Sequence, residues 1–178
     1  MFEILPNWHP LFVHFTVALY TASFLFFVLG RVFFGQAWSG ECLTAAFWTL
    51  WLGAIISVFT VAAGFYAFNT VRHDALSHAA MTDHRNWALA TAGTWWLIAL
   101  WSLRQKRKGG GVTSPFLAGV AVAVVLLMST GWKGGELVYR HGLGVLYPTK
   151  TENSEGAAGQ GHAHEENKDH HHGDDHSY

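Results

Sequence analysis

Histidine is the residue type of this chain most able to bind a metal or a cofactor, and there are twelve of them. Six lie next to the ends of three hydrophobic stretches, and the hydropathy pattern predicts that they gather at one face of a membrane: His9, His14, His73, His78, His84 and His141. Neutral imidazole is the commonest metal ligand, and ionisable residues at membrane depth are costly unless something uses them. This group is therefore the candidate site.

The spacing of these histidines favours a ligand held between helices. His9 and His14 are five residues apart, which is about 140° of rotation on a helix, so they cannot chelate one metal from one helix face. A b-type haem takes one imidazole from each of two helices. We expect His14 and His84 as one axial pair, and His141 with His78 or His9 as ligands of a second haem.

Basic residues stand beside the candidate ligands and could pair with haem propionates, because arginine binds carboxylates bidentately. They are Arg72, Arg85 and Arg140. Contact with lipid headgroups would explain the same residues.

Two other interpretations compete with haem. The histidines, with Asp74, Asp83 and Glu136, could bind copper or zinc, and a histidine-rich tail could collect the ions. The candidate ligands are then His14, His84 and His141, with His162, His164, His170, His171, His172 and His176 in the tail. Alternatively, the chain is a structural subunit whose histidines are ordinary interfacial residues.

Four apolar stretches, 11–35, 43–69, 86–103 and 113–132, approach or exceed the ~20 residues that cross a bilayer. The chain is therefore predicted to be an all-α integral membrane protein with a four-helix bundle. The segment 69–83 is expected to form a short interfacial helix, with Thr82 or Asp83 capping the third span. A single cysteine excludes an internal disulfide, and the near-neutral charge of −1 points to no nucleic-acid partner.

Four spans place both termini on one side of the membrane, together with the six histidines. The basic cluster before Gly109 favours the opposite side as cytoplasmic, so the termini are predicted to be periplasmic, at the bacterial inner membrane. Residues 1–148 form the expected haem-binding domain. Residues 149–178 are rich in Gly, Glu, Asp and His and are expected to be a disordered, metal-binding tail. No internal repeat is evident.

Two motifs resemble a bacterial membrane-protein family, domain of unknown function 2231. Residues 7–15 (NWHPLFVHF) are similar to its opening HPxxVHF pattern, and residues 134–142 (GGELVYRHG) to its closing GGxLVYxHG pattern. His84 matches a histidine at the start of its third helix. The resemblance covers residues 8–146. Members are sometimes fused to Rieske iron–sulfur or cytochrome c modules, so the resemblance implies a redox setting and favours haem at His9, His14, His84 and His141.

We expect an electron-transfer subunit with one or two bis-histidine haems near the periplasmic face, rather than a stand-alone enzyme. Hydrolase and nucleotide-binding motifs are missing from the sequence. The expected partners are the lipid bilayer and a periplasmic redox protein or membrane respiratory partner, with quinol as a candidate electron donor. An oligomer is compatible with the sequence.

Overall fold

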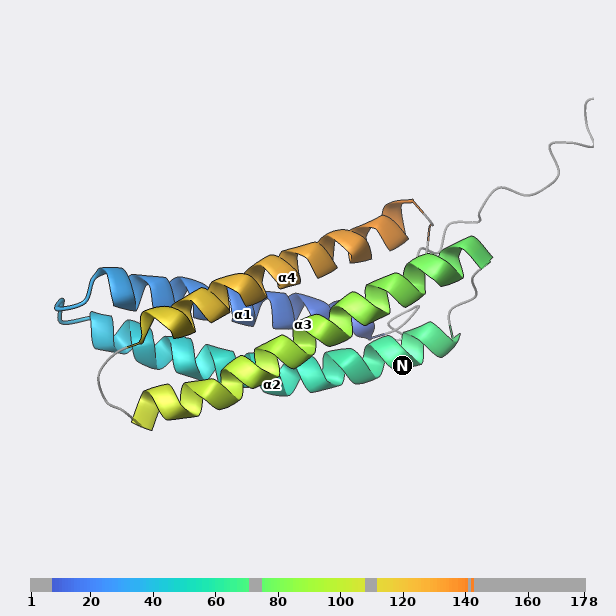
Figure 1. Ribbon diagram of the computed structural model, residues 1–178. Helices are drawn as coiled ribbons and strands as arrows, with labels where there is room; N and C mark the ends of the chain where they lie inside the picture. The colour runs from blue at the N-terminus through green and yellow to red at the C-terminus, as the bar shows by residue number, and fades with distance from the viewer. Residues whose placement is uncertain (1–7, 71–74, 108–111, 141, 143–178) are drawn as a thin grey trace, which may run out of the picture. The chain divides into compact units, whose positions relative to one another are not determined.

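The computed structural model describes residues 8–70, 75–107, 112–140 and 142, and these form four α-helices with their connections. The helices are α1 (His9–Val32), α2 (Ser39–Thr70), α3 (Ala75–Arg107) and α4 (Ser114–Tyr139). Consecutive helices run in opposite directions (Figure 1). Helices α1 and α3 begin at one end of the bundle, and helices α2 and α4 end there. We call this the histidine end. The all-α, four-helix prediction is confirmed.

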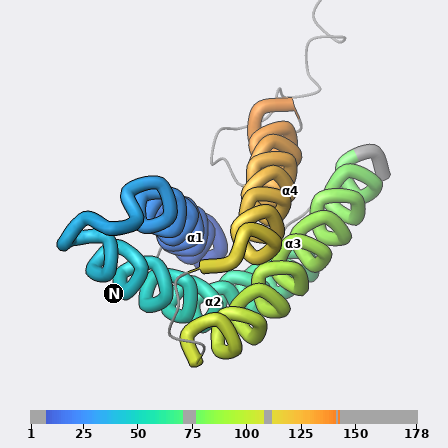
Figure 2. Tube along the Cα trace, turned by 60° about the vertical axis from the view of Figure 1, so that its left-hand side comes forward, coloured from blue at the N-terminus to red at the C-terminus, as the bar shows by residue number. Residues whose placement is uncertain are grey.

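Three of the helices, α1, α2 and α4, are long and apolar enough to cross a membrane. Helix α3 does not reach the same hydropathy, because its apolar stretch 86–103 is short and contains Trp, Thr and Ser. It nevertheless packs along α2 and α4 inside the bundle (Figure 2). Its charged residues Asp83, Arg104, Lys106 and Arg107 are exposed near its two ends, so its low hydropathy does not reflect a position outside the bundle.

Proline and glycine residues mark the start of α1 and both ends of α4. Pro10 and Pro115 lie in the first turns of α1 and α4, where the missing N–H costs nothing. Gly142 follows α4 with a φ of 61°, and its N–H donates to the carbonyl of Val138 at 3.1 Å. A left-handed residue in this position is the usual way to end a helix.

The expected short interfacial helix before the third span is wrong. Helix α3 starts at Ala75 and continues without a break through Thr82 and Asp83. The carboxylate of Asp83 forms an ion pair with Lys133 of α4 instead of capping a helix. No proline interrupts this region, so the first two turns of α3 simply extend the span.

The core is aromatic at the middle of the bundle. Tyr20 of α1 and Trp95 of α3 are both almost fully buried, and their rings stack with centroids 4.0 Å apart. One layer further along, Phe27 packs edge-on against Phe47 of α2 and Phe116 of α4. These contacts join the hairpin α1–α2 to the hairpin α3–α4, which lie side by side in Figure 2.

Candidate functional site

His9 is the first residue of α1, and its imidazole is held against α2. Its Nδ1 lies 3.0 Å from the carbonyl oxygen of Thr60. A carbonyl can only accept, so Nδ1 is the donor, and in the neutral ring the lone pair is on Nε2. The ring rests on Gly64, where an added Cβ would lie only 3.0 Å from the imidazole Cε1. A larger residue here would require the ring to shift.

His84 of α3 is held against α4 in the same manner. A Cβ at Gly134 would lie 3.1 Å from the imidazole Cε1 of His84. The ring also lies against the backbone of Thr130, one turn before that glycine. Its Nδ1 is buried but makes no hydrogen bond of standard geometry. The contact with the Thr130 backbone corresponds to that of His9 with the carbonyl of Thr60 in α2.

His9 and His84 lie on the inner faces of their helices at the histidine end. Each lies 11 residues before a member of the Tyr20–Trp95 stack, and 11 residues are about three helical turns, so each histidine shares a helix face with its stacked residue. The two rings are close enough for His9 to act electrostatically on His84. The structure thus brings together His9 and His84 at the histidine end.

The other predicted ligands that the structure describes lie elsewhere. His14 is exposed, and its Nδ1 bonds the carbonyl of Pro10 in the preceding turn. His78 is exposed near the start of α3, with its ring 5.5 Å from that of Phe68. The remaining predicted ligands lie outside the described residues: His73, His141, His162, His164, His170, His171, His172 and His176.

The predicted propionate-binding arginines have other contacts. Arg85 lies over the ring of Phe68, with its guanidinium carbon 4.8 Å from the centroid. Arg140 forms an exposed pair with Glu136 at 3.4 Å. Arg72 lies outside the described residues. A role in binding propionates stays a prediction for all three.

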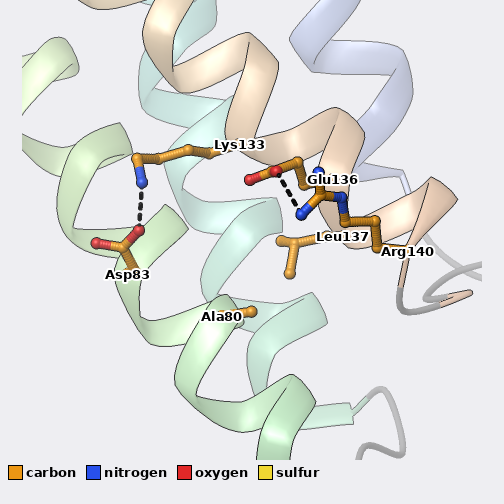
Figure 3. Close-up of a pocket in the computed structure, with 6 residues that line it drawn as sticks. All are labelled: Ala80, Asp83, Lys133, Glu136, Leu137 and Arg140. Atoms are coloured by element: carbon orange, nitrogen blue, oxygen red, sulfur yellow. Dashed lines mark hydrogen bonds and ion pairs between the residues drawn. The ribbon is translucent and has the colours of Figure 1, made fainter.

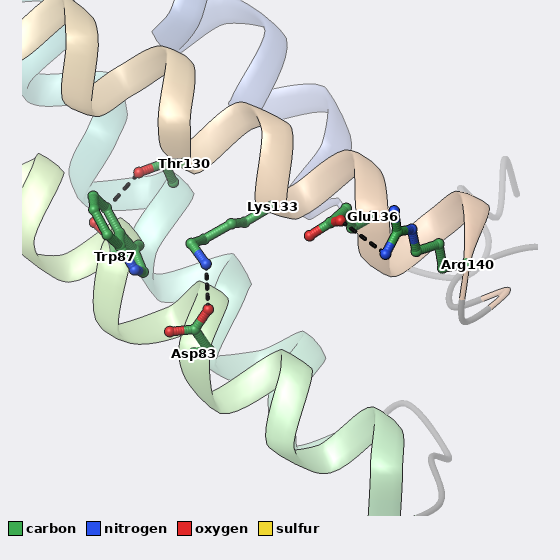
Figure 4. Close-up of polar contacts among 6 residues, drawn as sticks. All are labelled: Asp83, Trp87, Thr130, Lys133, Glu136 and Arg140. Atoms are coloured by element: carbon green, nitrogen blue, oxygen red, sulfur yellow. Dashed lines mark hydrogen bonds and ion pairs between the residues drawn. The ribbon is translucent and has the colours of Figure 1, made fainter.

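A small polar hollow lies between α3 and α4 at the histidine end (Figure 3). It is lined by Ala80, Asp83, Lys133, Glu136, Leu137 and Arg140. Both basic residues pair with acids in the hollow, Lys133 with Asp83 and Arg140 with Glu136 (Figure 4). Figure 4 also shows that the Thr130 hydroxyl donates to the carbonyl of Trp87, which joins the two helices one turn along α3 from Asp83.

Gly64 and Thr60, which seat the imidazole of His9, were not predicted as part of the site, whereas Gly134 lies in the closing motif. Gly64 is one of several small residues in its helix, and nothing in the local sequence distinguishes it from a packing glycine. Thr60 contributes only its backbone carbonyl. Their role depends on which residue of the neighbouring helix lies at the same level, and the local sequence pattern carries no such information.

Among the described residues, no group of three or more His, Cys, Asp or Glu side chains gathers to hold a bare metal ion. The imidazoles of His9 and His84 are the candidate ligands that this part of the chain holds inside the bundle. The tail, where a copper or zinc site was the alternative, lies outside the described residues.

Comparison with known proteins places the chain in a family. No curated protein and no solved structure matches it. A family model does match, over residues 6–146, which include all four helices and both motifs that carry the resemblance. The chain therefore belongs to the family described as predicted membrane protein (DUF2231).

Proposed function

We propose that this protein binds a b-type haem between His9 and His84 and transfers electrons at the histidine end of the bundle. The observation that carries the proposal is the pair of imidazoles on two different helices, each seated against a glycine of the adjacent helix. The axial pair favoured by the sequence was His14 and His84. The exposed position of His14 leads us to replace it with His9.

The chemistry of the donor set fits haem. Haem iron already has four porphyrin nitrogens and needs only two axial ligands, whereas a bare zinc or copper ion normally takes three or more protein ligands. Two facing imidazoles satisfy the first requirement but not the second. The hydrogen bond from His9 Nδ1 to Thr60 also matches the way ligating histidines are oriented, with the other ring nitrogen donating to a backbone carbonyl.

Haem would supply one-electron chemistry, and the chain would supply position and environment. His9 and His84 would act as axial ligands, and the glycines would keep their rings in place. The partly buried position near apolar helices would limit access of water, which is one of the ways a protein sets a haem potential.

The orientation and partners form part of the proposal. Arg104, Lys106 and Arg107 lie at the end of α3 far from the histidines, which favours that end as cytoplasmic. The haem would then lie near the periplasmic face of a bacterial inner membrane. There it would exchange electrons with a periplasmic redox protein or a membrane respiratory partner, with quinol as the candidate donor.

The experiment is a visible spectrum of the full chain, purified in detergent from cells supplied with a haem precursor, before and after dithionite. We expect a reduced α-band typical of bis-histidine haem. His9→Ala and His84→Ala should each lose it, while His14→Ala and His78→Ala, the matched controls, should keep it. A colourless wild-type protein, or loss only in the His14 variant, would contradict the proposal.

A further inference from the structure

The four helices repeat one pattern of contacts twice. His84, Thr91 and Trp95 of α3 each lie 75 residues after His9, Thr16 and Tyr20 of α1. Likewise, Val120, Thr130 and Gly134 of α4 each lie 70 residues after Leu50, Thr60 and Gly64 of α2. Each position of the first hairpin thus has an equivalent in the second.

Equivalent positions make equivalent contacts. Within the first hairpin, the Thr16 and Thr60 hydroxyls lie 2.7 Å apart, and within the second the Thr91 and Thr130 hydroxyls also lie 2.7 Å apart. The His9 ring packs on Gly64, and the His84 ring packs on Gly134. Both the interhelical hydrogen bond and the seat of the imidazole therefore occur twice.

Burial follows the same correspondence. Every buried residue of α1 has a buried equivalent in α3, although the side chains differ: Thr16, Tyr20, Ser23, Phe27 and Gly30 correspond to Thr91, Trp95, Ile98, Ser102 and Gln105. Every buried residue of α4 has a buried equivalent in α2: Phe116, Val120, Ala123 and Leu127 correspond to Ala46, Leu50, Gly53 and Ser57. The two hairpins therefore turn equivalent positions toward the core.

We infer that the bundle is two copies of one hairpin related by a local twofold axis, and that His9 and His84 are the equivalent ligands of a single group on that axis. The stack of Tyr20 on Trp95 supports the position of the axis, because equivalent residues can touch directly only near it. Since both hairpins run in the same direction, the axis lies along the bundle and passes between the two histidines.

The inference rests on the proposed function for the identity of the ligand and deepens it by fixing the number bound. His14 has Leu89 as its equivalent, so it has no histidine partner under the local symmetry. A symmetric bis-histidine site can therefore form only once among the described residues, and one haem per chain is expected rather than two.

Two measurements on the full chain test the inference. The ratio of haem to protein should be one, and His9→Ala and His84→Ala should lower this ratio equally.

The second measurement is cross-linking and does not depend on haem. In a Cys42→Ser background, a short bifunctional thiol reagent should join the two cysteines of the variant His9→Cys with His84→Cys within one chain. His14→Cys with His84→Cys is the matched control and should react far less. If the variant with cysteines at 9 and 84 aggregates, Thr16→Cys with Thr91→Cys tests the same faces of α1 and α3, seven residues further along each helix.

The outcomes separate this inference from the proposed function. A colourless protein in which the 9/84 pair still cross-links would refute haem binding and support the symmetric pair. Two haems per chain, unequal effects of the two histidine substitutions, or cross-linking of the 14/84 pair as efficient as that of the 9/84 pair would overturn the inference.

Discussion

The hairpin α1–α2 and the hairpin α3–α4 bury equivalent positions but differ in charge. At the histidine end the first hairpin has Pro10, Ala63 and Tyr66 where the second has Arg85, Lys133 and Glu136. The two hairpins share the packing of a histidine on a glycine and the hydrogen bond between two threonines. The charged residues Arg85, Lys133 and Glu136 belong to the second hairpin alone. The comparison therefore distinguishes contacts that both hairpins make from charges that only one hairpin carries.

The largest expected effect comes from filling the glycine seats. Gly64→Leu and Gly134→Leu each place a side chain where an imidazole now lies, so each should abolish binding of the haem, and overpacking should destabilise the fold by about 1–3 kcal/mol. Gly135→Leu is the matched control, because a Cβ there meets nothing within 4 Å. Haem content and thermal unfolding in detergent measure the result. A much smaller effect of one glycine substitution than of the other would contradict the equivalence of the two hairpins.

A smaller effect is expected from the paired threonines. Thr16→Val and Thr91→Val each remove a hydrogen bond between helices, which in membrane proteins is typically worth about 0.6 kcal/mol. The two variants should lower the free energy of unfolding by similar amounts, measured by titration with a denaturing detergent. Thr94→Val serves as control, since its exposed hydroxyl bonds only within its own helix. Unequal costs would show that one hairpin carries more of the interface.

The smallest effect on stability is expected where the halves differ. Lys133→Ala gives the second hairpin the alanine that the first hairpin has at the equivalent position, and its partly exposed pair with Asp83 should contribute about 0–1 kcal/mol. The midpoint of thermal unfolding should therefore change little. The haem midpoint potential should shift in the negative direction, because a positive charge near the site is lost. An unchanged potential would place this charge too far from the haem to matter.

Much of the fold follows from local patterns. The four apolar stretches predicted four helices, and Pro10, Pro115 and Gly142 lie at ends of α1 and α4, where each acts on the backbone around itself. The boundary expected at Asp83 failed for a tertiary reason. Its carboxylate has a partner in Lys133, 50 residues later, and an ion pair across helices leaves no local signal.

The site could be predicted only in part. Hydropathy placed the histidines at one end of the bundle, and the structure describes His9, His14, His78 and His84 near that end. Which of them face one another depends on how α1 and α3 are rotated in the bundle. That rotation is set by the core around Tyr20 and Trp95, which only the folded chain assembles.

By itself, the amino-acid sequence determined an all-helical membrane protein with its histidines at one end, since hydrophobic length and helix-ending residues act locally. Only the tertiary structure decided that His9, rather than His14, is packed against a neighbouring helix, and that contacts of the first hairpin recur in the second. The duplicated positions hold different side chains, such as Phe27 and Ser102, because packing requires a buried position to be filled and does not require the same residue to fill it.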